Sequence, residues 1–290
     1  MMTMDGKQGL VFGVANERSY ATHIAKALAD AGAEGGFSHL PGEKNERRTA
    51  NALESIGVSN PWLQPCDVAN DDDLDAIFER FSKDFGRLDF VVHSVAFADK
   101  SFLELGKFIE TPREVWNQAL DISAYSLLGM ARRARPLMTD GGAVVSMSYL
   151  GGEKVVPGYN VMGIAKAALE HATRYLAMEL GREGIRVNAI SGGPLRTISA
   201  MGVGGIEAIL EHTRRMAPLN RTVEGEEVGS VATFLLSDAA GGITGEIVHV
   251  DVGMHVYANT PDLQCYHEDQ CGRLGKGGRS ECGGGERHQC

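Results

Sequence analysis

Tyr159 and Lys166 are the two residues whose types and spacing most directly suggest catalysis. They lie seven positions apart in a segment with helical periodicity, so at about 100° per residue they return to nearly the same helix face. A phenol there can donate a hydrogen bond to a substrate carbonyl as charge develops on its oxygen, and an ammonium can stabilise that charge and bind a ribose hydroxyl. In an arbitrary pair of this kind, the Tyr more often packs against the sheet and the Lys lies in solvent. The flanking residues must therefore distinguish a catalytic pair from a structural one.

The elements that would hold this pair are short apolar runs alternating with longer segments of helical periodicity. The apolar runs occupy residues 10–12, 90–93, 143–147, 185–190 and 247–250, and the helical segments occupy residues 20–31, 73–85, 115–130, 164–180 and 228–236. Such alternation is typical of a parallel sheet covered on both faces. The sequence therefore predicts a single α/β fold, a Rossmann-like, doubly wound parallel sheet of about seven strands with helices on both faces. The second strand, residues 35–39, is its weakest part because Gly35 and Gly36 have no side chains to pack.

Residues 13–21 connect the first apolar run to the first helix and could bind a pyrophosphate. Gly13 follows the strand, and Ser19 is expected to cap a helix whose N-terminus attracts anions. The usual G-x-G-x-x-G spacing is absent, so a plain strand-to-helix turn is an equally open interpretation. Asp67-Val68 and Ser94-Val95 follow two further strands, at the edge where open α/β sheets bind ligands. For Asp67 the alternative is a cap for a helix that starts near Asp71.

Three segments near the pair carry a resemblance to a known family: residues 148–151, 159–166 and 186–197. They resemble the NADH-dependent enoyl-acyl-carrier-protein reductases of bacterial type II fatty acid synthesis, a divergent branch of the short-chain dehydrogenases/reductases. The likeness runs from about residue 6 to residue 257. Common short-chain dehydrogenases place a Tyr four residues before the Lys, where this chain has Met162. In the enoyl reductases, as here, one Tyr comes seven residues before the Lys and a second, Tyr149, lies ten residues further upstream.

The resemblance implies reduction of trans-2-enoyl-acyl-carrier-protein thioesters by NADH, the last reductive step of fatty acid elongation. It assigns Tyr159 to enolate stabilisation and Lys166 to the nicotinamide ribose, and it places Tyr149 and Ala98 in the substrate pocket, where Tyr149 could assist protonation. It assigns cofactor contacts to Gly13, Ser19, Tyr20, Asp67, Val68, Ser94, Val95, Lys166, Gly193, Pro194, Leu195, Arg196, Thr197, Ile198 and Ser199. Residues 197–212 match a lid over the acyl chain.

Two departures from the family pattern bear on ligands. Leu40 leaves the second strand without an acidic ribose anchor, and Lys44, Arg47 and Arg48 are nearby, so the expectation of NADH rests on family likeness and NADPH use stays open. Ala96 stands where family members commonly have Gly beside the nicotinamide pocket. Its methyl group is expected to weaken binding of a planar inhibitor stacked on the cofactor.

Composition narrows the class of protein. The 290 residues include 28 Lys and Arg against 38 Asp and Glu, and a net charge of −10 disfavours nucleic acid as a partner. No apolar window of about 18 residues predicts a membrane span, and the polar N-terminus predicts no secretory signal, so a cytoplasmic location is expected. The resemblance implies a homotetramer and a substrate bound to acyl carrier protein or to CoA. Two alternatives stay open: a carbonyl reductase of the same superfamily, which Met162 disfavours, and a catalytically silent nucleotide-binding protein.

Four of the five cysteines lie in the last 26 residues, which marks a boundary in composition. We expect an enoyl reductase domain over residues 1–258 and a disordered Gly/Cys-rich tail over residues 259–290, because the tail lacks apolar periodicity. The Cys and His residues of the tail, Cys265, His267, Cys271, Cys282, His288 and Cys290, are spaced unlike paired zinc ligands. No metal is expected, and a zinc site in the tail is the minor alternative.

Overall fold

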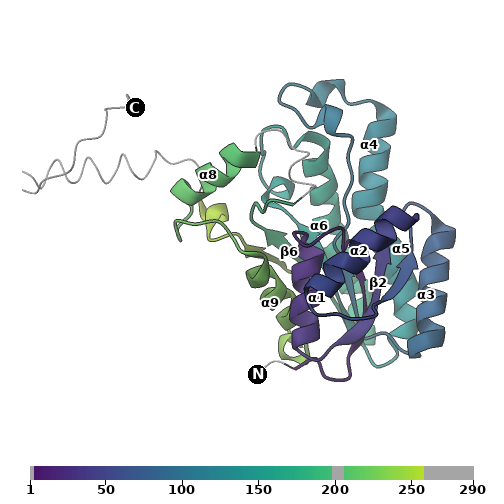
Figure 1. The fold of residues 1–290 in the computed structure, drawn as a ribbon. Coiled ribbons are helices and arrows are strands. Elements are labelled where there is room, and N and C mark those ends of the chain that lie inside the picture. Colours follow the sequence, from purple (N-terminus) through teal and green to yellow (C-terminus); the bar gives the residue numbers. More distant parts are fainter. Residues whose placement is uncertain (1–2, 198–205, 258–290) are drawn as a thin grey trace, which may run out of the picture.

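A computed structural model describes residues 3–197 and 206–257, which form a parallel sheet flanked by helices (Figure 1). The seven strands lie in the order β3-β2-β1-β4-β5-β6-β7, as a doubly wound fold requires, so the predicted fold class is confirmed. The strands are β1 (Gln8–Phe12), β2 (Glu34–His39), β3 (Trp62–Pro65), β4 (Phe90–His93), β5 (Gly142–Ser148), β6 (Ile185–Gly192) and β7 (Ile247–Val250). The helices are α1 (Tyr20–Asp30), α2 (Glu43–Ser55), α3 (Asp71–Phe85), α4 (Arg113–Leu120), α5 (Ser126–Ala134), α6 (Asn160–Leu180), α8 (Ile206–Met216) and α9 (Gly225–Leu236).

Two hydrophobic cores cover the two faces of the sheet. Successive strand residues point to opposite faces, so Val11 of β1 packs in the core with α1, α2 and α9, while its neighbours Leu10 and Phe12 pack in the core with α3, α5 and α6. In Figure 1, α1 and α9 lie side by side, and the contacts between these two helices agree with that view. Burial on both faces explains why the strands are almost continuously apolar.

The second strand forms despite its glycines. A Cβ on Gly36 would collide with the ring of Trp62 in β3, and a Cβ on Gly35 would collide with the carbonyl oxygen of Gly9 in β1. The two glycines therefore allow close approach of β2 to both neighbouring strands. Strand propensity alone does not predict this role, because glycine has a low propensity for strands.

The helix predicted over residues 115–130 is not continuous. A π-helical turn, Asp121–Tyr125, separates α4 from α5. Two buried serines accompany the wider turn. The Ser123 hydroxyl donates to the carbonyl of Phe97 and accepts from its N–H, whereas Ser126 donates to the carbonyl of Ile122 within the turn. π-helical turns are associated with functional sites, and Ser123 in this turn holds the segment that follows β4.

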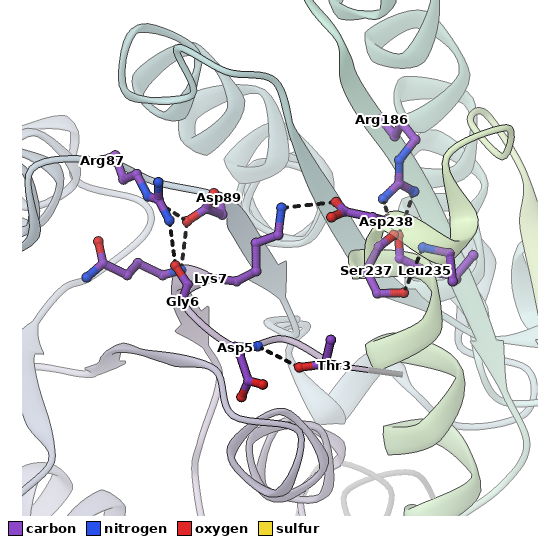
Figure 2. Close-up of polar contacts among 12 residues, drawn as sticks. Thr3, Asp5, Gly6, Lys7, Arg87, Asp89, Arg186, Leu235, Ser237 and Asp238 are labelled. Carbon is purple, nitrogen blue, oxygen red and sulfur yellow. Dashed lines mark hydrogen bonds and ion pairs between the residues drawn. The ribbon is translucent and has the colours of Figure 1, made fainter. Parts of the chain in front are cut away.

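Polar contacts at the amino ends of the strands join β1 to β4 and join both β1 and β6 to the end of α9 (Figure 2). Lys7 pairs with Asp238 at 3.0 Å, Arg87 donates to the Gly6 carbonyl at 2.5 Å, and Arg186 donates to the carbonyls of Leu235 and Ser237. These contacts fix the chain just before β1 and β4 and at the start of β6. Within the described residues, no helix combines the length and the apolar character that a membrane span requires.

Candidate active site

A cavity of about 690 Å³ lies at the carboxyl edge of the sheet, next to the point between β1 and β4 where the strand order reverses. Ligands of open α/β sheets bind at such a switch point. Residues following β1, β4, β5 and β6 line the cavity together with the start of α6 and α8. The residues expected from the sequence that line it are Gly13, Ser19, Tyr20, Ser94, Val95, Ala98, Tyr149, Tyr159, Lys166, Gly193, Pro194, Leu195 and Thr197.

Some expected residues lie elsewhere. Val68 is buried in the core beneath α3, and the carboxylate of Asp67 accepts the N–H of Ala69 in the turn after β3. The α3 cap is Asn70, which accepts the N–H of Asp72, so the alternative role of Asp67 as that cap is wrong. Arg196 pairs with Glu207 of α8. Ile198, Ser199, the first part of the expected lid and the predicted tail lie outside the described residues.

Ser19 occupies the N-cap position of α1, but the expected side-chain cap is wrong. Its hydroxyl donates to the carbonyl of Asn16 at 3.0 Å and lies 2.8 Å from the Thr22 hydroxyl, and no helix N–H bonds to it. The bonds to Asn16 tighten the turn before α1 instead. The adjacent Tyr20 side chain crosses the cavity edge and donates its hydroxyl proton to the carbonyl of Gly193 after β6.

Tyr149 and Tyr159 lie against each other in the cavity wall. Their rings meet edge to face with centroids 4.9 Å apart and planes inclined at 71°. Burial raises the pKa of the Tyr159 hydroxyl above its usual range, and Tyr149 adds to the rise; burial and Asp251 raise the pKa of Tyr149. Both phenols are therefore protonated near neutral pH and can donate hydrogen bonds to an oxygen in the cavity.

Lys166 is buried, with 5% of its surface exposed, and still lines the same cavity. Burial lowers the pKa of its ammonium to about 8, while Glu170 opposes that change. Its Nζ donates to the carbonyl of Met147 at 2.7 Å. An ammonium has three N–H donors, so those not bound to Met147 can serve a ligand.

Glu170, one helical turn after Lys166, is a buried acid that the sequence analysis missed. It accepts a hydrogen bond of 2.5 Å from the Ser148 hydroxyl, and burial raises the pKa of its carboxyl. Lys166 and Glu170 thus bind consecutive residues at the end of β5, directly before Tyr149. The signal available in the sequence was an acid four residues after Lys166, on the same helix face.

His93 is a second buried polar residue near the site. The sequence analysis placed it in an apolar strand and gave it no role. It is fully buried at the end of β4, and burial together with the Lys166 charge lowers the pKa of its imidazole to about 3. Its Nε2 lies 2.8 Å from the Ser126 hydroxyl, whose own proton goes to the carbonyl of Ile122. The neutral imidazole therefore donates through Nε2 and links β4 to the start of α5.

Comparison with known proteins identifies the family. A family model described as enoyl-(acyl carrier protein) reductase matches residues 13–255. The NADH enoyl-acyl-carrier-protein reductase FabI of Synechocystis sp. is 48% identical over 259 residues, covering 88% of this chain and 99% of that protein. The NADPH enzyme FabI of Staphylococcus aureus is 46% identical over 255 residues, covering 88% of this chain and 99% of that protein.

Solved structures agree with these sequence relatives. The Bacillus cereus enoyl-acyl carrier protein reductase, solved with NADP+ and indole naphthyridinone, is 47% identical with a TM-score of 0.86, covering 89% of this chain and 100% of that chain. The Anaplasma phagocytophilum reductase, solved with NAD, is 44% identical with a TM-score of 0.83, covering 90% of this chain and 96% of that chain. The resemblance stated from the sequence is thereby confirmed: this chain belongs to the enoyl-acyl-carrier-protein reductase family.

Proposed function

We propose that this protein reduces the C2–C3 double bond of trans-2-enoyl thioesters, carried by acyl carrier protein or CoA, with NADH as the reductant. The observation that carries the proposal is that Tyr149, Tyr159 and Lys166 line one cavity at the switch point of the sheet. The net reaction consumes one NADH and one proton and yields the saturated thioester and NAD+.

The cavity fits a nicotinamide dinucleotide. Gly13 has a φ of 104°, and a Cβ there would collide with the carbonyl oxygen of Ser94, so glycine lets the β1–α1 turn pack directly against the end of β4 in the cavity wall. Gly13, Ser19 and Tyr20 would hold the pyrophosphate end, with Ser94, Val95 and residues 193–197 along the rest of the molecule. Lys166 would hold the nicotinamide ribose. Asp67 and Val68 as adenine contacts, and Ile198 and Ser199 as further cofactor contacts, stay predictions.

Bound NADH would supply the hydride that adds to C3 of the enoyl thioester. Tyr159 donates a hydrogen bond to the thioester carbonyl oxygen, so the enolate charge that develops there meets a donor already in place. Lys166 keeps the surrounding potential positive, and Tyr149 closes the pocket against the Tyr159 ring and assists protonation at C2. Ala98 contacts the acyl group.

An assay that follows NADH absorbance distinguishes this function from its alternatives. Crotonyl and longer 2-enoyl thioesters are expected to cause oxidation of NADH, whereas 3-oxoacyl thioesters are not. Oxidation with the 3-oxoacyl substrate alone would favour a carbonyl reductase. NADH binding without oxidation by either substrate would favour a silent nucleotide-binding protein. NADPH in place of NADH tests cofactor choice, since Leu40 after β2 offers no acidic anchor.

Gly151 leaves no room for a side chain beside the two tyrosines. A Cβ there would lie 2.8 Å from Cε1 of Tyr159 and 3.3 Å from Cδ1 of Tyr149. We expect Gly151→Ala to displace the Tyr159 ring and lower kcat by about tenfold to a hundredfold. Gly181→Ala is the matched control because a Cβ on Gly181 meets nothing within 4 Å. Equal kcat values for the two variants would refute this steric role.

Ala96 is exposed in the cavity wall, next to the segment that Ser123 holds. Its methyl group should crowd a planar inhibitor stacked on the cofactor, so Ala96→Gly is expected to lower the inhibition constant of such a compound by about tenfold. The Michaelis constant for the enoyl thioester serves as the internal control, because a substrate that avoids this spot is affected less. Equal inhibition constants for the two forms would contradict the expectation.

The proposed assembly is a homotetramer in the cytoplasm. Its support is a set of exposed apolar side chains on α6 and the adjoining π-helical turn and α5, where large apolar groups gain free energy by pairing with a second copy. These side chains are Tyr125, Leu128, Ile164, Tyr175 and Met178.

A further inference from the structure

Tyr159 lies between two residues with left-handed backbone conformations. Gly158 has a φ of 81° and Asn160 a φ of 42°, whereas Tyr159 has a φ of −77°. Asn is among the few residues with a side chain that adopt this region with little strain. A left-handed residue at the first position of α6 is a local feature that helix formation alone does not require. The backbone of Tyr159 is therefore flanked on both sides by a residue with a positive φ.

Both N–H donors of the Asn160 side chain are used. Its Nδ2 donates to the carbonyl of Phe102 and to the carbonyl of Glu104, each at 2.7 Å. An amide group has two N–H donors, so these two bonds satisfy both of them. Across the same contact, a Cβ on Gly158 would lie 3.7 Å from the carbonyl oxygen of Leu103. Residues 102–105 thus lie directly over residues 158–160.

The segment that Asn160 holds forms one wall of the cavity. Ala98, Asp99, Lys100 and Leu103 line it on the side of Tyr159. Leu103 is buried in a small apolar cluster with residues of α6, and both Ala98 and Tyr159 pack against that cluster. Because the amide joins this wall to the residue next to Tyr159, displacement of either one moves the other.

We propose that Asn160 is a positioning residue that couples the orientation of the Tyr159 phenol to the cavity wall formed by residues 98–103. This inference rests on the proposed function, because the wall and the phenol would meet the same acyl thioester. Two properties of Asn160 are required together: a left-handed backbone and a pair of N–H donors. Gly adopts the left-handed backbone but has no side-chain donors. Asp also adopts this backbone, but its carboxylate would face two carbonyl oxygens and could not donate to them.

The test compares Asn160→Gly and Asn160→Asp with Asn60→Gly. Asn60 is a matched control, since it is exposed, has a φ of 50° and precedes β3 at the amino edge of the sheet, away from the cavity. For Asn160→Gly we expect kcat to fall about tenfold to a hundredfold. KM for the enoyl thioester should rise several-fold, while the Kd for NADH and the values of the control stay within about twofold of wild type.

Two outcomes would overturn the inference. One is an Asn160→Gly protein with wild-type kcat and KM; the other is a proportional loss of NADH affinity in both Asn160 variants, which would indicate general disruption. Amide hydrogen exchange supplies a readout that does not depend on activity: residues 98–105 should exchange faster in Asn160→Gly than in Asn60→Gly. Unchanged exchange would also refute the coupling. A wild-type protein that binds NADH but reduces no enoyl thioester would refute the proposed function instead.

Discussion

Replacement of Tyr159 by phenylalanine is expected to lower kcat for enoyl thioester reduction by about 10²–10³-fold, the usual effect of removing one donor from an oxyanion site. The variant keeps the ring, so the edge-to-face contact with Tyr149 and the packing against the Leu103 cluster remain. It loses only the hydroxyl, whose raised pKa keeps it protonated as a donor. The Kd for NADH should change little, because the ribose is assigned to Lys166.

Steady-state kinetics and NADH fluorescence titration check this expectation together. Tyr257→Phe is the control, since Tyr257 follows β7 and is not among the residues that line the cavity. A Tyr159→Phe protein that keeps wild-type kcat would rule out the phenol as the donor to the enolate oxygen. A loss of NADH affinity equal to the loss of kcat would assign Tyr159 to cofactor binding.

Replacement of Lys166 by alanine or methionine is expected to weaken NADH binding. Hydrogen bonds to charged groups contribute about 1.5–3 kcal/mol, which corresponds to a rise in Kd of about tenfold to a hundredfold. Methionine fills more of the space that the lysine stem occupies, so it separates the loss of charge from the loss of packing. Lys83→Met on the exposed face of α3 is the control. Unchanged NADH affinity in Lys166→Met would reject the ribose role.

The pH dependence provides a second test of Lys166. Burial lowers the pKa of this ammonium to about 8, so the free protein carries the charge below that pH and loses it above. The Kd for NADH should therefore rise as the pH increases through about 8 in the wild type and stay flat in Lys166→Met.

Deprotonation of Lys166 is expected to weaken NADH binding but to increase the stability of the fold. The folded pKa lies below the ordinary value of 10.5, so the unfolded chain binds the extra proton between about 8 and 10.5. The cost of burying the charge is full below pH 8 and is relieved as the pH rises towards 10.5. The difference in Tm between Lys166→Met and wild type should follow this change, and a difference that is constant across that range would contradict it.

Local pattern accounts for most of the fold. The apolar runs ending at Phe12, His93 and Met147 correspond to β1, β4 and β5, because strands buried on both faces must be apolar throughout. The prediction was weakest where neighbours decide the conformation. The glycines of β2 reduce strand propensity, yet they admit Trp62 and the backbone of β1.

The interruption between α4 and α5 has the same kind of cause. Periodicity over residues 115–130 reports an apolar face, but the π-helical turn depends on Ser123 bonding to Phe97. Phe97 lies 26 positions away, so no local window contains that contact. The side-chain cap expected at Ser19 failed for a related reason, because its hydroxyl is taken up by Asn16 and Thr22.

The amino-acid sequence was sufficient for the fold class, the family and the spacing of Tyr149, Tyr159 and Lys166, since these depend on residue type and periodicity along the chain. Only the tertiary structure shows that Glu170 binds the end of β5 beside Lys166, that His93 is neutral, and that Asn160 joins Tyr159 to the wall at residues 98–103. Burial, proton affinity and hydrogen-bond partners depend on groups brought together from distant parts of the chain. Their distances in space, which set these energies, are not encoded in any short stretch of residues.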